Sequence, residues 1–490
     1  MEPLTWTGPL GQFLDPVLYA LSAIFLLAVV VQIILSVAAT GERVVTNPDG
    51  TLSSAGGIYG TSSAATRWAG AALLVVVLAY IVVGVFGGPS SVGIIGGMSQ
   101  QLTPVWIALI ATFALSITYK RKLGLYGKLF DSTVGMIGFA LVMFWVYAGI
   151  MAGIFDWVTT HDSLSQVSGM KNKVPGTPLR GAEEGDYAWY LLGGDNLARD
   201  VFSRLFKGAW VVVQIAPLAT LFAFMVGITL GLPAGYYGGR LDTILSFLAN
   251  LILAFPVILL FYLLVTPEIV ATGIPNYMAT VLFIFPLIFV GVLLNSRFYT
   301  QPSFRTPLLV VVLGIMGWIY LSLISTYGAV VATDSYRIPG LPNGVDLFNI
   351  DPGILVVFVS VVFVNAPTVF RIVRGLALDI KTRDYVAAAQ TRGEGPWYIM
   401  LWEILPNARG PLIVDFCLRI GYTTILLGTL GFFGLGLESE SPDWGTTINA
   451  GRRLLAVYPH AAIAPAVSLL TLVLGLNLLA DGLREESLKD

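Results

Sequence analysis

Residue types that could perform catalysis or bind a metal are scarce in this chain. Cys417 is the single cysteine, which excludes an internal disulfide, and two histidines leave little for a zinc site. No nearby Ser–His–Asp or His–Glu grouping makes His161 or His460 catalytic, so we expect both to be solvated or interfacial. The stretch 124–128 ends in Gly-Lys but lacks the spacing and the Ser or Thr of a GxxxxGK(S/T) phosphate loop. The chain therefore cannot hydrolyse ATP by itself.

A few polar residues lie inside long apolar runs, where charged groups are costly. Asp415 and Arg419 would share one face of a helix, and we expect them to pair near the lipid headgroups, where an arginine can snorkel. Asn250, Asn295 and Asn365 could line a path or tie helices together, and the sequence favours neither reading.

The composition places these residues in a membrane protein. Of 490 residues, 56% are hydrophobic and 11% charged, and the mean hydropathy is +0.81. A soluble protein has about 25% charged residues. The net charge of −2 also excludes nucleic-acid binding through positive charge alone.

Uncharged runs long enough to cross a bilayer recur along the chain, since about 20 apolar residues suffice for a helix. The run 68–119 is broken by the turn-prone 87–91, so we interpret it as two helices joined by a short loop. Glycine pairs among Gly227, Gly231 and Gly235 allow close helix contact. The runs predict about eleven spans, at 17–41, 68–119 (two), 132–155, 208–239, 243–267, 269–296, 306–333, 352–370, 412–437 and 459–479.

Basic residues set the predicted orientation, because short loops rich in Lys and Arg stay in the cytoplasm. The cluster at 120–128 makes the loop after the third span cytoplasmic and places the N-terminus outside. No basic residue precedes the first apolar run, which disfavours a cleaved signal peptide. The longest outside segment, 156–207, is too short for a domain but long enough for a lateral helix. The longest inside segment is 371–411.

The inside segment predicts a helical hairpin. Residues 384–392 form a short helix that Gly393 ends, and a second helix with several aromatic residues starts near Pro396. Pro406 ends or kinks that second helix at Leu405. Such a hairpin suits the docking of a partner or the covering of its own bundle, and physical reasoning alone favours neither.

The run DYVAAAQTRGEGPWYIMLWEILPNA at 384–408 resembles the EAA loop of ABC importer permeases, and is most similar to the second, C-type subunit of the dipeptide/oligopeptide/nickel group. In that family the loop docks in a cleft of the ATPase and transmits its closure. Ala387 stands where the motif has its glutamate, and Glu403 where the group often has histidine. The resemblance implies ATPase coupling by Asp384, Ala387, Ala388, Ala389, Gly393, Glu403, Leu405 and Pro406.

Other segments resemble the same group. Residues 194–204 are similar to its GTDxLGRDVxSR segment, with Ala198 in place of a glycine and Gly194 in place of a threonine. Further similarities lie at 235–239, 254–256, 442–445, 451–452 and 477–484, so the resemblance covers roughly 130–265 and 350–485.

The resemblance implies an all-α polytopic membrane protein with the type I ABC importer fold, of six core helices plus about five extra helices. Residues 1–119 would form a three-helix extension, and 120–490 the permease domain, with a two-helix insertion at 269–333 and the coupling loop at 371–411. The added helices would pack peripherally against the core or a neighbouring subunit, or form an accessory path or regulatory contact.

The implied function is that of a permease subunit, not an enzyme, in an ATP-driven importer of peptides or another small solute such as nickel or a sugar. Its expected partners are membrane lipid, a second permease, two ATPases that carry ATP and magnesium, and an extracytoplasmic binding protein facing 194–207 and 438–453. This chain would hold no cofactor and would lie in the plasma (inner) membrane of a prokaryote.

Two rival functions remain. A secondary transporter driven by an ion gradient would want inverted repeats and deep ionisable residues, and an intramembrane enzyme would want facing catalytic groups. Neither set of features is evident in the sequence.

Overall fold

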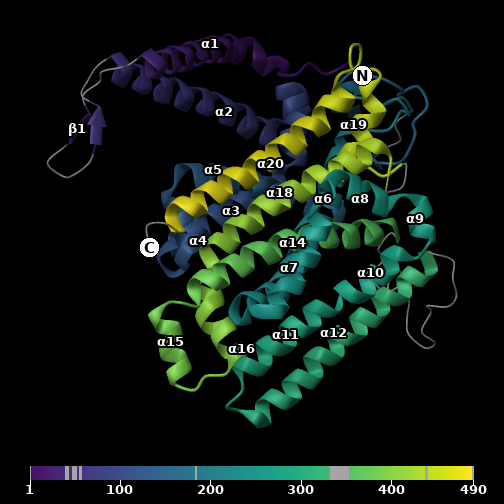
Figure 1. Cartoon of the computed structure of the whole chain (residues 1–490). Coiled ribbons are helices and arrows are strands. Elements are labelled where there is room, and N and C mark those ends of the chain that lie inside the picture. Colours follow the sequence, from purple (N-terminus) through teal and green to yellow (C-terminus); the bar gives the residue numbers. More distant parts are fainter. Residues whose placement is uncertain are drawn as a thin grey trace. The chain divides into compact units, whose positions relative to one another are not determined.

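The computed structural model describes residues 2–38, 44–46, 52–54, 58–181, 185–330, 352–435 and 440–487. Nearly all regular structure in these ranges is helical (Figure 1). Helices suit a membrane chain because each satisfies its own backbone hydrogen bonds. The predicted all-α polytopic class is confirmed, while the predicted span ends at 39–41, 331–333 and 436–437 lie outside the described residues.

The chain divides into two compact units. The first comprises Met1–Trp106 and Trp157–Ser203, and the second comprises Ile107–Asp156 and Arg204–Asp490. Within the described residues, 10 helices are long and apolar enough to cross a membrane, or 11 if the pair Gly239–Leu253 and Val257–Val265, bent by 81°, counts as one span. The structure thus agrees with the predicted number of spans. The proposed domain boundaries at 119 and 269–333 stay predictions.

The first unit holds α1 (Gly8–Ala38) packed on α2 (Ile58–Gln101), with β1 (Val44–Thr46) and β2 (Leu52–Ser54) paired antiparallel. The hydroxyl of Tyr80 donates to Asp15 Oδ1 at 2.7 Å and ties the two helices together. The break predicted at 87–91 is confirmed: Gly88 and Gly93 have non-helical backbone angles, so α2 consists of two helices separated by a sharp kink. The chain folds back at this kink, because a Cβ added at Gly84 would come within 3.0 Å of Gly96 and of Ser99. Both glycines at the kink have positive φ, a conformation that glycine adopts readily.

The lateral helix considered for the outside segment is absent from its described residues. Between 157 and 200, apart from the undescribed 182–184, the chain forms loops and the antiparallel pair β3 (Thr177–Pro178) and β4 (Trp189–Tyr190). Buried Met170, Tyr190 and Ala198 form a small hydrophobic core there.

The second unit is a helical bundle that carries the rest of the chain. Two of its helices, α3 (Thr103–Tyr119) and α6 (Val201–Tyr237), have their first residues in the first unit. The remaining elements are η1 (Lys120–Lys122), α4 (Gly124–Lys128), η2 (Leu129–Asp131), α5 (Thr133–Gly153), α7 (Gly239–Leu253), α8 (Val257–Val265), α9 (Pro267–Ala271), α10 (Ile274–Leu282), α11 (Ile284–Arg297), α12 (Pro302–Val330), α14 (Pro352–Ile380), α15 (Asp384–Thr391), α16 (Pro396–Tyr398), η4 (Ile399–Ile404), α17 (Leu405–Asn407), α18 (Arg409–Phe433), α19 (Trp444–Arg452) and α20 (His460–Ser487).

Close helix contacts in this bundle depend on small residues. A Cβ added at Gly138 of α5 would come within 2.3 Å of the Leu479 backbone nitrogen on α20. The three glycines at 227, 231 and 235 pack in the same way against α14, which confirms the predicted close contact. Such approach matters in lipid, where helices associate through packing rather than through the hydrophobic effect.

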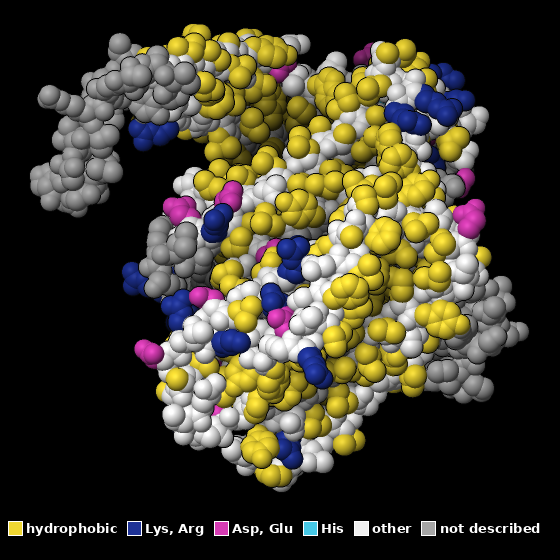
Figure 2. Space-filling model, viewed as in Figure 1, with side chains coloured by type: hydrophobic (Ala, Val, Ile, Leu, Met, Phe, Trp, Pro, Cys, Tyr) yellow, Lys and Arg dark blue, Asp and Glu magenta, His cyan; other side chains and the backbone are white. Residues whose placement is uncertain are grey.

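Hydrophobic side chains are spread widely over the visible face of the second unit (Figure 2), as expected for helices that meet lipid. Two polar pairs lie inside it. Arg419 Nε lies 2.6 Å from Asp415 Oδ2, which confirms their predicted pairing. Asn365 Nδ2 lies 3.4 Å from Thr423 Oγ1 and joins α14 to α18, so this asparagine ties helices together.

Candidate functional site

The predicted hairpin is present and consists of α15, α16, η4 and α17, between α14 and α18 (Figure 1). Gly393 ends α15 in the left-handed conformation, with φ +77°. Its N–H donates to the Gln390 carbonyl, and the Glu394 N–H donates to the Ala389 carbonyl at 3.3 Å. These two bonds are those of a Schellman motif, which glycine favours. The helix end predicted at Gly393 is confirmed.

The second arm begins at Pro396, as predicted, and has π-helical geometry over Ile399–Ile404. Pro406 lies in the following short turn, α17, so the chain changes helix type at Leu405. A proline lacks the N–H that would continue the α-helical hydrogen bonds. Of the two predicted alternatives, an end or a kink of the helix at Leu405, the structure supports the kink, since helix continues from Leu405 to Asn407 and again from Arg409.

One face of the hairpin is anchored in a hydrophobic core shared with α6, α14 and α18. Burying one large apolar side chain contributes about 1.5–3 kcal/mol, so the anchor outweighs any exposed polar contact of the hairpin. Its fully or nearly fully buried members include Val386, Ala389, Ile399, Met400, Leu401 and Ile404 of the hairpin, Val369, Val373, Ala377 and Ile380 of α14, and Phe224 and Leu232 of α6.

The opposite face is open. Among the residues predicted to couple to an ATPase, Asp384, Ala387, Ala388, Gly393 and Pro406 are exposed. Glu403 and Leu405 are half-buried, whereas Ala389 is fully buried in the shared hydrophobic core. Because the exposed side chains at 387 and 388 are small, a partner could approach the backbone of α15 closely there.

Polar contacts fix the hairpin and the helices around it. Arg392 Nη2 donates to Glu403 Oε1 at 2.9 Å and joins the two arms. Lys381 Nζ donates to the Gly235 carbonyl at 2.7 Å, at the end of α6, where a cation is favoured. Hydrogen bonding to Asp379 raises the pKa of Arg383.

Sequence reasoning missed two long-range contacts. The Arg374 guanidinium binds both carboxylate oxygens of Asp242 and ties α14 to α7. The indole N–H of Trp402 donates to Ser296 Oγ at 3.0 Å. The partners lie more than 100 residues apart, and no local pattern pairs them.

A second buried network joins the start of α6 to α19. Arg204 Nη2 donates to the Ser441 carbonyl at 2.8 Å, and Trp444 Nε1 donates to the Leu205 carbonyl at 2.8 Å. Asp443 accepts from the Thr446 N–H and caps α19. Burial raises the pKa of Asp443 despite these bonds from Thr446. Parts of the two segments expected to face a binding protein, 204–207 and 440–453, thus lie together, whereas 438–439 are not described.

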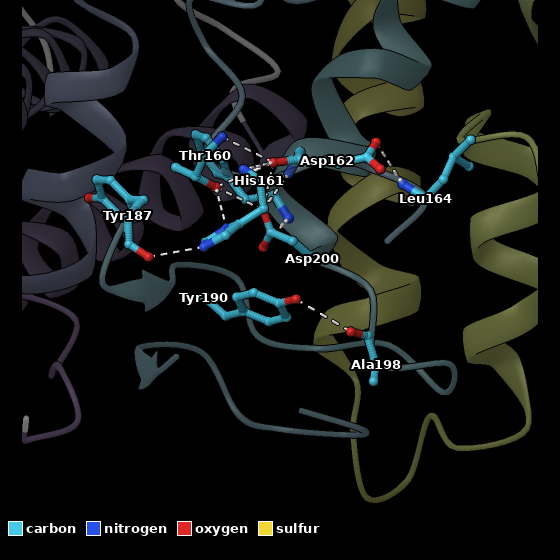
Figure 3. A network of polar contacts seen from close by, with 10 residues as sticks. Thr160, His161, Asp162, Leu164, Tyr187, Tyr190, Ala198 and Asp200 are labelled. Atoms are coloured by element: carbon cyan, nitrogen blue, oxygen red, sulfur yellow. Dashed lines mark hydrogen bonds and ion pairs between the residues drawn. The ribbon is translucent and has the colours of Figure 1, made fainter. Parts of the chain in front are cut away.

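His161 is not solvated, because its side chain is 11% exposed and held in a polar network of the first unit (Figure 3), while the interfacial alternative stays a prediction. Its Nε2 lies 3.0 Å from the Tyr187 carbonyl, and its Nδ1 lies 3.5 Å from Asp200 Oδ2. The hydroxyl of Ser203 donates to Asp200 at 2.6 Å, not to the histidine, so this grouping is not a catalytic triad. Burial raises the pKa of Tyr187 to about 12.

Asp200 and Asp195 organise the segment 194–204. Asp200 accepts from the Phe202 and Ser203 N–H groups and caps α6. Asp195 accepts from Arg199 Nε at 2.7 Å, with both side chains 2% exposed. Between them, Ala198 has φ +65°, a conformation that favours glycine. The glycine expected at this position from the family resemblance therefore has a structural reason.

The protein is a bundle of helices long and apolar enough to span a membrane, with a hairpin that is buried on one face and exposed on the other. This architecture is that of a membrane permease subunit. The chain belongs to the family described as binding-protein-dependent transport system inner membrane component, which matches residues 227–485. It is a permease subunit of an ABC importer, not an enzyme, and a multi-pass protein of the bacterial inner membrane. The predicted type I importer fold and family are confirmed, and the family implies an ATPase and other subunits.

Several curated relatives are similar over most of their length. The glutathione transport system permease protein GsiD of Pectobacterium atrosepticum is 28% identical over 302 residues, which cover 62% of this chain and 73% of the relative. The dipeptide permease DppC of Alkalihalophilus pseudofirmus is 26% identical over 69% of this chain and 80% of its own. The di/tripeptide permease DppC of Pseudomonas aeruginosa is 25% identical over 76% and 93%. Nothing in these comparisons supports a secondary transporter.

Proposed function

We propose that this chain forms half of the translocation pathway of the importer and couples to a separate ATPase through the hairpin 384–406. The carrying observation is the open surface of α15 at Ala387 and Ala388, held in place by the buried core beneath it. Closure of the ATPases on ATP and magnesium would move this surface and shift the pathway between inward- and outward-facing states. The full assembly would contain a second permease, two ATPases and an extracytoplasmic binding protein.

Co-purification tests the coupling. We expect a tagged chain to recover an ATPase and a second permease, and Ala388→Glu to lose the ATPase alone, because position 388 is exposed and the charge leaves the core intact. Gly393→Pro should also release the ATPase, since proline cannot adopt φ +77°. Leu123→Glu, at an exposed position of the other predicted cytoplasmic loop, is the matched control. Retention of the ATPase by both hairpin variants would refute the proposal.

The proposed cargo is a small peptide. The names of the relatives state transport of dipeptides, di/tripeptides and glutathione, which supports this class. We expect deletion of the chain's gene to abolish uptake of a labelled dipeptide by the cells that carry it. Unchanged dipeptide uptake with loss of nickel or sugar uptake would show that the cargo belongs to another class.

A further inference from the structure

The inserted helices make direct contact with the hairpin. The helix α11 lies beside α16, and its side chains Phe289, Val292 and Leu293 pack on the hydrophobic core that anchors the hairpin. Phe289 and Val292 line one small cavity with Trp397 and Leu401 of the hairpin. The insertion therefore contacts the second arm of the hairpin that would move in the proposed coupling.

Trp402 of the hairpin is held by two consecutive residues at the end of α11. Its indole N–H donates to Ser296 Oγ at 3.0 Å, while Ser296 donates its own proton to the Leu293 carbonyl. The Arg297 guanidinium lies over the Trp402 ring, 5.0 Å from the centroid. A hydrogen bond fixes the edge of the indole and a cation–π contact fixes its face, so this side chain has one orientation relative to α11.

We infer that the insertion positions the coupling hairpin through this Trp402 clasp, defined as the contacts of Trp402 with Ser296 and Arg297. Residues 396–404 are then held from two sides, by the core of α6 and α14 and by α11. Movement of the hairpin must carry α11 with it or break the clasp. The inserted helices α10–α12 thus regulate how efficiently closure of the ATPases is transmitted to the translocation pathway.

This inference depends on the proposed ATPase coupling, and its test uses the complete importer reconstituted in nanodiscs with Mg-ATP. We expect Trp402→Phe and Ser296→Ala each to lower kcat of ATP hydrolysis about two- to tenfold, the range of one net hydrogen bond. The KM for ATP should be unchanged, because the nucleotide site lies on the partner. Ser296→Thr keeps the hydroxyl and should restore kcat to within about twofold.

Hydrogen exchange gives a second readout in the same sample. Amides of 396–407 should exchange faster in Trp402→Phe and Ser296→Ala, and the double variant should be no worse than the more severe single variant. Tyr320→Phe is the matched control, because the Tyr320 hydroxyl donates to the Thr280 carbonyl at 2.9 Å within the insertion and leaves the clasp untouched. It should change neither readout.

The outcomes separate the two proposals. If Ala388→Glu releases the ATPase but the clasp variants keep normal kcat and exchange, the hairpin couples and the inference about the insertion is wrong. Additive losses in the double variant would also overturn it, since they would mean that Ser296 and Trp402 act separately. If Ala388→Glu retains the ATPase, the coupling proposal itself fails.

Discussion

Arg392 and Glu403 form the ion pair that joins the two arms of the hairpin, with Nη2 and Oε1 2.9 Å apart. Glu403 occupies the position where related permeases often have histidine, and here it has a cationic partner in the opposite arm. The Arg392 side chain is 53% exposed and that of Glu403 is 23% exposed, so solvent screens much of their attraction. The buried core, not this pair, holds the hairpin together.

The first prediction concerns this pair. Glu403→Gln should lower the free energy of unfolding by at most about 1 kcal/mol, as is typical of ion pairs that solvent reaches. The ATPase should still co-purify. Thermal unfolding in detergent and partner recovery measure the two effects. A loss of several kcal/mol, or of the ATPase, would show that the pair matters more than its exposure indicates.

The end of α15 should require glycine for its backbone conformation alone. Gly393 has φ +77° with nothing within 4 Å of an added Cβ, so Gly393→Ala should cost about 1–2 kcal/mol through strain without a clash. Gly395→Ala is the control, because Gly395 has φ −68° and equal space. It should be neutral or slightly stabilising. Equal thermal shifts in the two variants would contradict this assignment.

Replacing Ala198 with glycine should stabilise the protein. Relief of backbone strain at φ +65° should raise the free energy of unfolding by about 1–2 kcal/mol. The greater conformational freedom of glycine in the unfolded chain should lower it by roughly 0.5–1 kcal/mol. Ala198→Gly should therefore slow proteolysis of the segment 157–203. The same change at Ala387, inside the helix α15, should destabilise by about 1 kcal/mol. Faster cleavage of the 157–203 segment in Ala198→Gly would disprove the prediction.

Asp443 should make stability fall with rising pH. Its raised pKa means that the folded chain holds this proton more tightly than the unfolded chain does. The free energy of unfolding then decreases as pH rises from about 3.9, the ordinary Asp value, to the raised value. Asp443→Asn keeps an acceptor for the Thr446 N–H and cannot ionise, so it should flatten this slope. An unchanged slope in unfolding midpoints would exclude this origin.

Labelling can test the predicted orientation, since Cys417 is the only cysteine. In a Cys417→Ala background, a membrane-impermeant maleimide should label Leu164→Cys in intact cells. It should label Gln390→Cys only after permeabilisation. Both positions are exposed. Labelling of Gln390→Cys in intact cells would invert the topology and remove the hairpin from the ATPase side.

The predictions that held were those that depend on local physics. Helices in a membrane follow from apolar runs and internal backbone hydrogen bonds, and the end of α15 follows from the glycine at 393. The break predicted at 87–91 held for the same reason, because Gly88 and Gly93 adopt positive φ and interrupt the helix there. Of the two alternatives for His161, the solvated one was wrong, because Tyr187 and Asp200 contact the ring from distant positions of the same segment.

The sequence by itself determined the membrane class, the helical spans, the hairpin and the family resemblance, because each rests on composition or on contiguous residues. Only the tertiary structure decided which polar side chains meet, such as Arg374 with Asp242 and Trp402 with Ser296. Those contacts depend on which faces of distant helices pack together. Hydrophobic runs in lipid do not determine which helix faces meet. Close packing at glycines and buried polar pairs determines it.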